Sequence, residues 1–204
     1  ADGGLSDYNA PILGPAAPTD AAGAARLWQA VARLGLPADV ARLERMPLAV
    51  HGRPNPLAML PGVTPSPLFG SLIELGSDFE AFLRARGKHF RKEVHRSYRV
   101  LERDGAWTFL APDDPAEARR LLDVLDAQQA QRMEGTGKTY ILGQAPVIAH
   151  YRAALADGLA AGTARIFALA VGDQVIATVF GLVDRDRFLL LRIANAGEAW
   201  KHCS

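Results

Sequence analysis

Residues 164–193 read ARIFALAVGDQVIATVFGLVDRDRFLLLRI, and this stretch decides the fold. It divides into three apolar runs separated by short polar turns: Ala164–Val171, Gln174–Val183 and Arg187–Ile193. A two-residue connection such as Gly172 and Asp173 between apolar runs is typical of a tight β-hairpin. We therefore predict three strands paired as an antiparallel meander. Their near-continuous hydrophobicity predicts that helices cover both faces of the sheet.

The residues before this stretch predict one more strand and two helices. Residues 106–110, AWTFL, read as a short strand. Asp114 is a helix cap, Pro115 takes the first helical position and Glu117 supplies a carboxylate three residues after the cap. A helix is therefore expected to run to about Met133. Another helix is expected from Pro146 to between Gly158 and Gly162. Helices around a mostly antiparallel sheet make an α/β or α+β layered domain.

A basic segment precedes these elements: residues 77–104 read SDFEAFLRARGKHFRKEVHRSYRVLERD. We predict one amphipathic helix, begun by a capping box of Ser77 and Glu80 and ended by Gly105. Apolar side chains recur every three or four residues and predict a buried face: Phe79, Phe82, Phe90, Val94 and Leu101. Basic side chains fall on the opposite side and predict a face toward solvent or a cleft, among them Lys88, Arg91, Lys92, Arg96 and Arg99. Either this is an ordinary solvated face, or it docks an anionic ligand such as phosphates, an anionic glycan or nucleic acid.

Composition narrows the class of protein. The 204 residues are 49% hydrophobic, enough for a real core, and the length suggests one domain or one and a part. The net charge of +1 argues against a chain that is a polycation throughout. A single cysteine, Cys203, excludes an internal disulfide and a cysteine-rich zinc site and fits a reducing compartment. No apolar run is long enough to span a bilayer, so we expect a cytoplasmic protein.

Two regions are expected along the chain. Residues 1–67 hold a loop, an alanine-rich helix from Ala21 to Leu36 and a proline-rich connection. Residues 68–204 hold the sheet and the helices around it, with residues 68–75 predicted to form a strand.

Four stretches carry a resemblance to a known family: LSDYNAP at residues 5–11, the basic segment with Gly105, residues 164–194, and NAGEAWKHCS at residues 195–204. Taken in order, they resemble acyltransferases of the GNAT superfamily, in particular the CelD/BcsL-type acetyltransferase domain, which is related to Fem-type transferases. The resemblance implies a GNAT-like α/β (α+β) core over residues 68–204. It also implies that the last helix and strands of such a core would follow Ser204, so the chain is expected to be truncated.

The resemblance implies a bacterial enzyme that moves an acyl group from acetyl-CoA, or another acyl-CoA, to an amine or hydroxyl without a metal. The acceptor is expected to be a small molecule or a glycan precursor for exopolysaccharide or cell envelope, and a homodimer is one expected state. In such folds the strand at Arg187–Ile193 lies beside the pantetheine arm. The cofactor-binding residues implied are Leu191, Arg192, Ile193, Asn195 and Ser204.

Candidate catalytic residues are Asp7, Tyr8 and His150. Asp7 and Tyr8 lie in a loop without packing periodicity, where they either handle the acceptor's proton or form an Asx-type turn beside a packed tyrosine. His150 with Tyr151 is either a general base pair or a helix-surface residue with a packing partner. The candidates for substrate binding are Lys88, Arg91, Lys92 and Arg96 on the basic segment and Lys138 and Tyr140 in a glycine-rich loop. That loop either closes over substrate or is plain solvent-exposed chain.

Two other functions stay open. A Fem-type transferase would take its acyl group from an aminoacyl-tRNA and would use the basic segment for the tRNA. A nucleic-acid-binding module would use the same segment without catalysis. Near-neutral charge and a single candidate exposed aromatic, Tyr98, argue against that module.

Overall fold

A computed structural model describes residues 9–34, 40–67, 69–134, 136–137 and 139–197. The chain divides into two compact units, Ala1–Glu74 and Leu75–Ser204. The first unit contains α1 (Ala21–Arg33), a two-stranded antiparallel pair of β1 (Ala49–Val50) and β2 (Arg53–Pro54), and the short helix η1 (Pro56–Met59). Helix α1 begins as predicted, because the Asp20 carboxylate accepts a hydrogen bond from the backbone N–H of Gly23 at 2.7 Å. The boundary between the units lies after Glu74, seven residues later than the expected division, and no strand forms in residues 69–75.

The second unit carries a four-stranded sheet. Its elements are α2 (Phe79–Ala85), α3 (Lys88–Asp104), β3 (Trp107–Leu110), α4 (Pro115–Glu134), η2 (Ile141–Gly143), α5 (Ala145–Ala161), β4 (Ala164–Val171), β5 (Gln174–Asp184) and β6 (Arg187–Asn195). The strand order is β3-β4-β5-β6 and every neighbouring pair is antiparallel. The predicted meander of three strands is therefore confirmed, as is the mixed α/β fold class.

Two local features shape the β5–β6 hairpin. The register shifts between Phe180, which pairs with Arg192, and Gly181, which pairs with Leu190, so Leu191 is an extra residue that bulges from β6. Gly181 has no side chain because none fits: a Cβ there would lie 2.5 Å from the Phe188 ring, and closer still to the backbone oxygen of Leu189. The Phe188 ring instead crosses β5 at this position and contacts Phe167 of β4, with ring centroids 5.5 Å apart.

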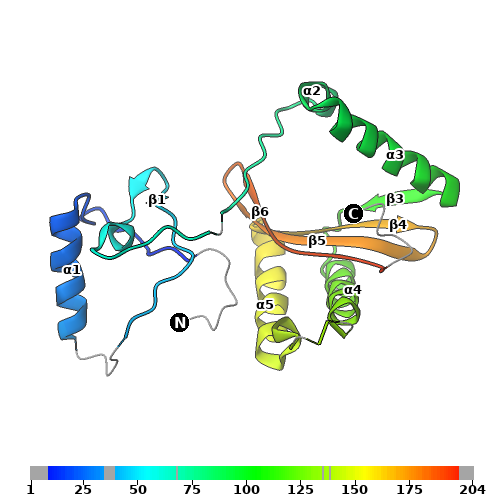
Figure 1. Ribbon diagram of the computed structural model, residues 1–204. Helices are drawn as coiled ribbons and strands as arrows, with labels where there is room; N and C mark the ends of the chain where they lie inside the picture. Colours follow the sequence, from blue (N-terminus) through cyan, green and yellow to red (C-terminus); the bar gives the residue numbers. More distant parts are fainter. Residues whose placement is uncertain (1–8, 35–39, 68, 135, 138, 198–204) are drawn as a thin grey trace. The chain divides into compact units, whose positions relative to one another are not determined.

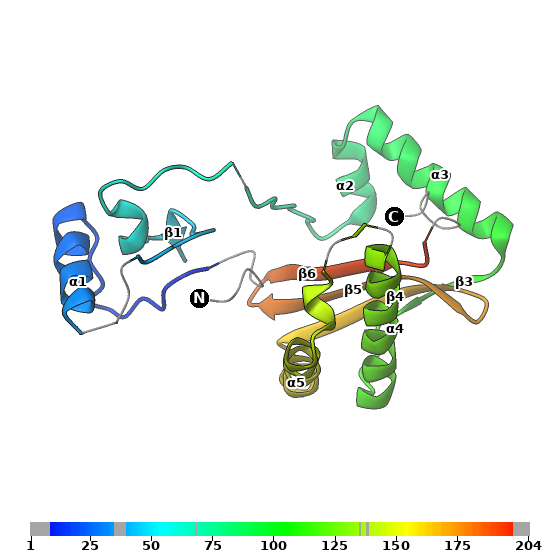
Figure 2. The same ribbon diagram turned by 60° about the horizontal axis from the view of Figure 1, so that its bottom comes forward.

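Helices α4 and α5 cover one face of the sheet, as Figures 1 and 2 both show. Helix α4 begins where the sequence predicts, because the Asp114 carboxylate accepts from the N–H of Glu117 at 2.9 Å. Leucines of the two helices pack on alternate residues of the strands and form the core: Leu121, Leu122, Leu125, Leu155, Leu159, Ala164, Ile166, Ala168 and Phe180. The packing of α4 and α5 on this face fixes the position of the strands.

The prediction that helices cover both faces is wrong for the described residues. The second face carries a row of aromatic rings across the sheet, from Phe109 through Phe167 to Phe188, and Phe109 is 60% exposed. Leu190 and Ile193, on the same face, are also exposed. Helices α2 and α3 lie on this side of the sheet (Figures 1 and 2) but leave the row uncovered.

The prediction of one helix over residues 77–104 is also wrong. Arg86 and Gly87 have extended backbone and separate α2 from α3. The residue that caps α2 is Asp78 rather than Ser77: its carboxylate accepts from the N–H of Glu80 at 2.9 Å. Glycine is a poor helix former, so the chain breaks where the pattern of apolar residues alone suggested continuity.

The predicted buried face of this segment is only partly buried. Leu101 is buried and Phe82 and Val94 are half-buried, but Phe79 and Phe90 are exposed, Phe90 by 47%. The apolar side of α3 reaches the sheet at its C-terminal end, where the Tyr98 and Trp107 rings lie 5.8 Å apart. Among the predicted outward-facing cations, Lys88, Lys92 and Arg99 are exposed and Arg91 is half-buried.

Candidate functional site

Strand β6 is an edge strand within the described part of the chain, because it pairs only with β5. An edge strand presents backbone N–H and C=O groups that no neighbouring strand uses. The bulge at Leu191 interrupts the ladder in the middle of this edge. Two of the predicted cofactor-binding residues, Leu191 and Ile193, have exposed side chains here. The strand therefore offers an extended ligand both backbone partners and apolar contacts.

The Arg192 side chain lies on the opposite side of β6, against α4 and α5, and is 1% exposed. Its Nη2 contacts Asp126 Oδ1 at 2.5 Å and also donates to the Tyr140 hydroxyl at 3.0 Å. Its Nε donates to Gln129 Oε1 at 3.0 Å, and its guanidinium lies 4.7 Å from the centre of the Tyr151 ring. The remaining nitrogen, Nη1, is buried and has no hydrogen-bond partner among the described residues. Because the side chain is enclosed, only the backbone of Arg192 faces the open edge.

We name Asp126, Gln129, Tyr140, Tyr151 and Arg192 the Arg192 cluster. Sequence reasoning found Tyr140 and Arg192 as separate candidates but missed Asp126 and Gln129. One signal was available: positions 128 and 129 continue the spacing of Leu121 and Leu125, yet both are glutamine. Gln128 is buried, donates to the Val175 carbonyl at 2.9 Å and accepts from the Thr178 hydroxyl at 3.0 Å. A polar residue at a position where the helical spacing predicts a buried residue indicates a hydrogen bond inside the protein.

Tyr140 attaches the loop between α4 and α5 to this cluster. Its hydroxyl donates to Gln129 Oε1 at 3.1 Å and accepts from Arg192. Burial raises the pKa of the Tyr140 phenol, and the nearby Arg192 charge opposes part of that effect. The phenol is therefore neutral at physiological pH and acts as a hydrogen-bonding residue.

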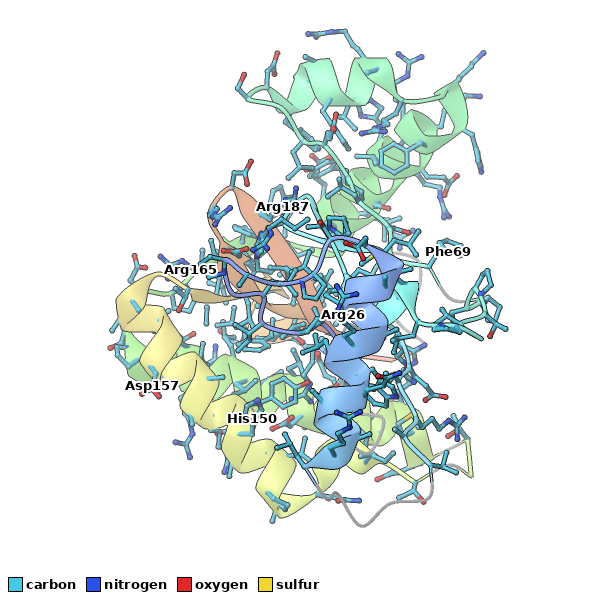
Figure 3. The ribbon with its side chains drawn as sticks, turned by 90° about the vertical axis from the view of Figure 1, so that its left-hand side faces the viewer. Arg26, Phe69, His150, Asp157, Arg165 and Arg187 are labelled. Carbon is cyan, nitrogen blue, oxygen red and sulfur yellow. The ribbon has the colours of Figure 1, made fainter. Side chains whose placement is uncertain are left out.

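His150 lies on α5, with Asp157 two helical turns further along the same helix (Figure 3). It is exposed, and its ring contacts the edge of the Tyr151 ring, with centroids 5.8 Å apart. Tyr151 in turn packs under Arg192 and against Phe180. The structure thus brings His150 to the margin of the Arg192 cluster, on the helix side of the sheet.

The basic side chains of α3 form a separate region. Lys88 and Lys92 are exposed, and Arg96 pairs with Glu93 of its own helix at 2.8 Å. Helix α3 joins the sheet through β3, the edge opposite β6. Three strand spacings of about 4.8 Å place these two edges about 14 Å apart. The described structure does not bring the basic residues against β6.

The other residues predicted for the site lie as follows. Asp7, Tyr8, Lys138 and Ser204 lie outside the described residues. Asn195 ends β6, and its side-chain oxygen accepts from the N–H of Gly197 at 3.2 Å. No group of His, Cys, Asp and Glu side chains suited to a metal ion occurs in the described ranges. Nor does any helix of those ranges have the length and hydrophobicity to cross a membrane.

The sheet and its helices correspond to a known domain. The acetyltransferase (GNAT) domain family matches residues 88–203, which is more than half of the chain and runs from the start of α3 past the end of β6. No curated protein and no solved structure matches the chain. The matched region contains the four-stranded sheet, the bulged edge strand and the Arg192 cluster. On this evidence the chain belongs to the acetyltransferase (GNAT) domain family.

Proposed function

We propose that this chain transfers an acetyl group from acetyl-CoA to an amine or hydroxyl of a small molecule or glycan precursor in the cytoplasm. The observation that carries this proposal is the bulged edge strand β6 inside a GNAT domain, a family whose members transfer acyl groups from acyl-CoA. We assign the pantetheine arm to the open edge of β6 at Leu191–Ile193, where the backbone groups other than the Ile193 carbonyl, which accepts from Gln129, are available to it. Asn195 and Ser204 are assigned towards the phosphates.

The chemistry needs the protein to bring the two substrates together, to stabilise the oxyanion and to accept a proton. The acceptor's lone pair attacks the thioester carbonyl and the bond from that carbon to sulfur breaks. The sulfur takes up the proton that the acceptor loses, so CoA leaves as the free thiol. Backbone N–H groups at the bulge are the groups we assign to the developing oxyanion, because fixed dipoles at that position stabilise the transition state. We assign proton transfer to His150 or to Asp7 and Tyr8.

The test of donor binding is a thermal unfolding series. We expect acetyl-CoA and free CoA to raise the melting temperature, because a ligand bound only to the native state stabilises it by about 2.7 kcal/mol at 100 times its Kd. Adenosine 3′,5′-bisphosphate, which lacks the pantetheine arm, is expected to give a smaller shift. Stabilisation by an aminoacyl-tRNA with none by either CoA species would contradict the proposal and favour the Fem-type alternative.

We also assign the anionic part of the acceptor to the basic side of α3, with Lys88, Arg91, Lys92 and Arg96 as the residues involved. The observation that supports Arg91 in particular is its half-buried position. On a helical wheel it lies at the margin between the basic side and the apolar side that reaches the sheet. Arg99, by contrast, is exposed at the centre of the basic side.

Arg91→Glu is expected to raise the acceptor's KM several-fold and to leave kcat and CoA binding unchanged, with the larger effect at low salt where charges are least screened. Arg99→Glu is the matched control, because it makes the same change of charge on the same helix. Steady-state kinetics at two ionic strengths measures both. Equal effects would show a general field without a specific contact, and no effect from either would leave α3 as a solvated surface.

A further inference from the structure

We propose that Gln129 is a positioning residue for acyl transfer: through both ends of its amide it holds the bulge of β6 in the geometry that receives the thioester. The inference rests on the proposed function. It adds to that function a residue on α4 that contacts neither substrate in our assignment.

The contacts of Gln129 fall directly beside the bulge. Its Nε2 donates to the backbone carbonyl of Ile193 at 3.0 Å, and its Oε1 accepts from the Nε of Arg192 at 3.0 Å. Arg192 and Ile193 are the two residues that follow the bulged Leu191. One side chain from another layer of the fold therefore contacts a side chain and a backbone group of the same short segment.

An edge strand with a bulge needs such a restraint more than an interior strand does. Strand β6 has β5 as its only described neighbour, and the ladder between them is interrupted at Leu191. Register is held by pairing and by side chains packed on one face, and on β6 many of the side chains are exposed. The hydrogen bonds from α4 supply a second attachment, independent of β5.

The chemistry of the amide explains why glutamine occupies this position. It must accept from the Arg192 guanidinium and donate to the Ile193 carbonyl at once, which an uncharged amide can do and a carboxylate or alkyl group cannot. Its Oε1 also accepts from the Tyr140 hydroxyl, so the loop before α5 is held by the same group. The strand that binds the donor and a loop predicted to contact the acceptor thus share one attachment.

Two variants separate the parts of this role. Gln129→Glu keeps acceptors for Arg192 and Tyr140 but removes the donor to Ile193, so it tests the attachment of the strand while the Arg192 charge stays paired. Gln129→Leu removes every contact. Gln131 is exposed on the same helix, so Gln131→Glu and Gln131→Leu are matched controls.

The experiment measures amide hydrogen exchange of the ligand-free full chain together with acetyl-CoA kinetics. We expect Gln129→Glu to speed exchange in peptides covering residues 190–195 but not in those covering β4. Its kcat per folded molecule should fall by about 100-fold, since displacement of reacting groups by about 1 Å has an effect of that order. The KM for acetyl-CoA should change much less. The Gln131 variants should match the wild type in all three readouts.

Two failures are distinguishable. A wild-type chain that releases no CoA thiol with any acceptor, and is not stabilised by CoA, overturns the proposed function. A wild-type chain that is active, with a Gln129→Glu variant of unchanged kcat or unchanged exchange in β6, overturns the positioning role alone. A variant that only melts at lower temperature, with normal kcat per folded molecule, also overturns it, because Gln129 would then serve stability and not geometry.

Discussion

Replacing Phe180 by alanine is expected to destabilise the chain by about 3–5 kcal/mol, the range for a large side chain removed from a closed core. Phe180 is 0% exposed and lies on the helix side of β5, where its ring meets the Tyr151 ring edge-on at 5.7 Å. The strands on either side of it are held by their own backbone ladders and the helices by their internal hydrogen bonds, so these elements move little and the space left by the ring cannot close fully. Urea unfolding of the wild type and the variant measures the difference.

Phe90→Ala is the matched control, with the same change made on α3. A fully buried Phe90 would also lose about 3–5 kcal/mol, but its ring is 47% exposed. We therefore expect a loss of about 1 kcal/mol, because only about half of the transfer free energy of about 1.5–3 kcal/mol for a fully buried side chain is lost and no closed cavity is left behind. A loss as large as that of Phe180→Ala would show that the apolar side of α3 is covered in solution, contrary to the exposure described above.

The comparison of these two phenylalanines shows what the sequence can and cannot predict about burial. Residue spacing correctly indicated which side of α3 is apolar, because a helix fixes the direction of each side chain. Whether another element packs on that side depends on tertiary contacts, which no local pattern contains. The same reason explains the uncovered row of Phe109, Phe167 and Phe188: near-continuous apolar strands predicted two covered faces, and the described helices cover one.

Elements defined by local chemistry were predictable. Gly172 marked the β4–β5 turn, where it adopts a positive φ of 56°, and Asp114 marked the start of α4. The bulge at Leu191 was not predictable, because it depends on the register between two strands. The break at Gly87 carried a signal in the sequence, because a glycine within a helical pattern weakens the helix there.

The residues of the candidate site also divide into those that could be predicted and those that could not. Arg192 was singled out through a family resemblance, while its partners were not, because Asp126 and Gln129 lie more than 60 residues away in sequence. A charged residue within the apolar run RFLLLRI is itself a signal, since buried arginines require partners. The sequence alone does not say which carboxylate supplies the partner; that choice is made by the packing of α4 on β6.

Asp126→Ala is therefore expected to destabilise the chain by about 3–5 kcal/mol, because it leaves the buried Arg192 guanidinium without its counter-charge. The Asp126 side chain is 16% exposed and that of Arg192 1%, so water cannot replace the carboxylate without opening the layer between α4 and β6. Asp123→Ala, three residues earlier on the same helix, is the control: Asp123 pairs with Arg152 at 2.8 Å at the surface, where such pairs contribute about 0–1 kcal/mol.

The double variant Asp126→Leu with Arg192→Met should recover most of the loss, since apolar residues of similar volume often replace a buried ion pair without net destabilisation. Chemical unfolding of the wild type, Asp126→Leu, Arg192→Met and the double variant gives the coupling energy between the two residues, and a coupling below about 1 kcal/mol would mean that the pair is solvated like Asp123 and Arg152.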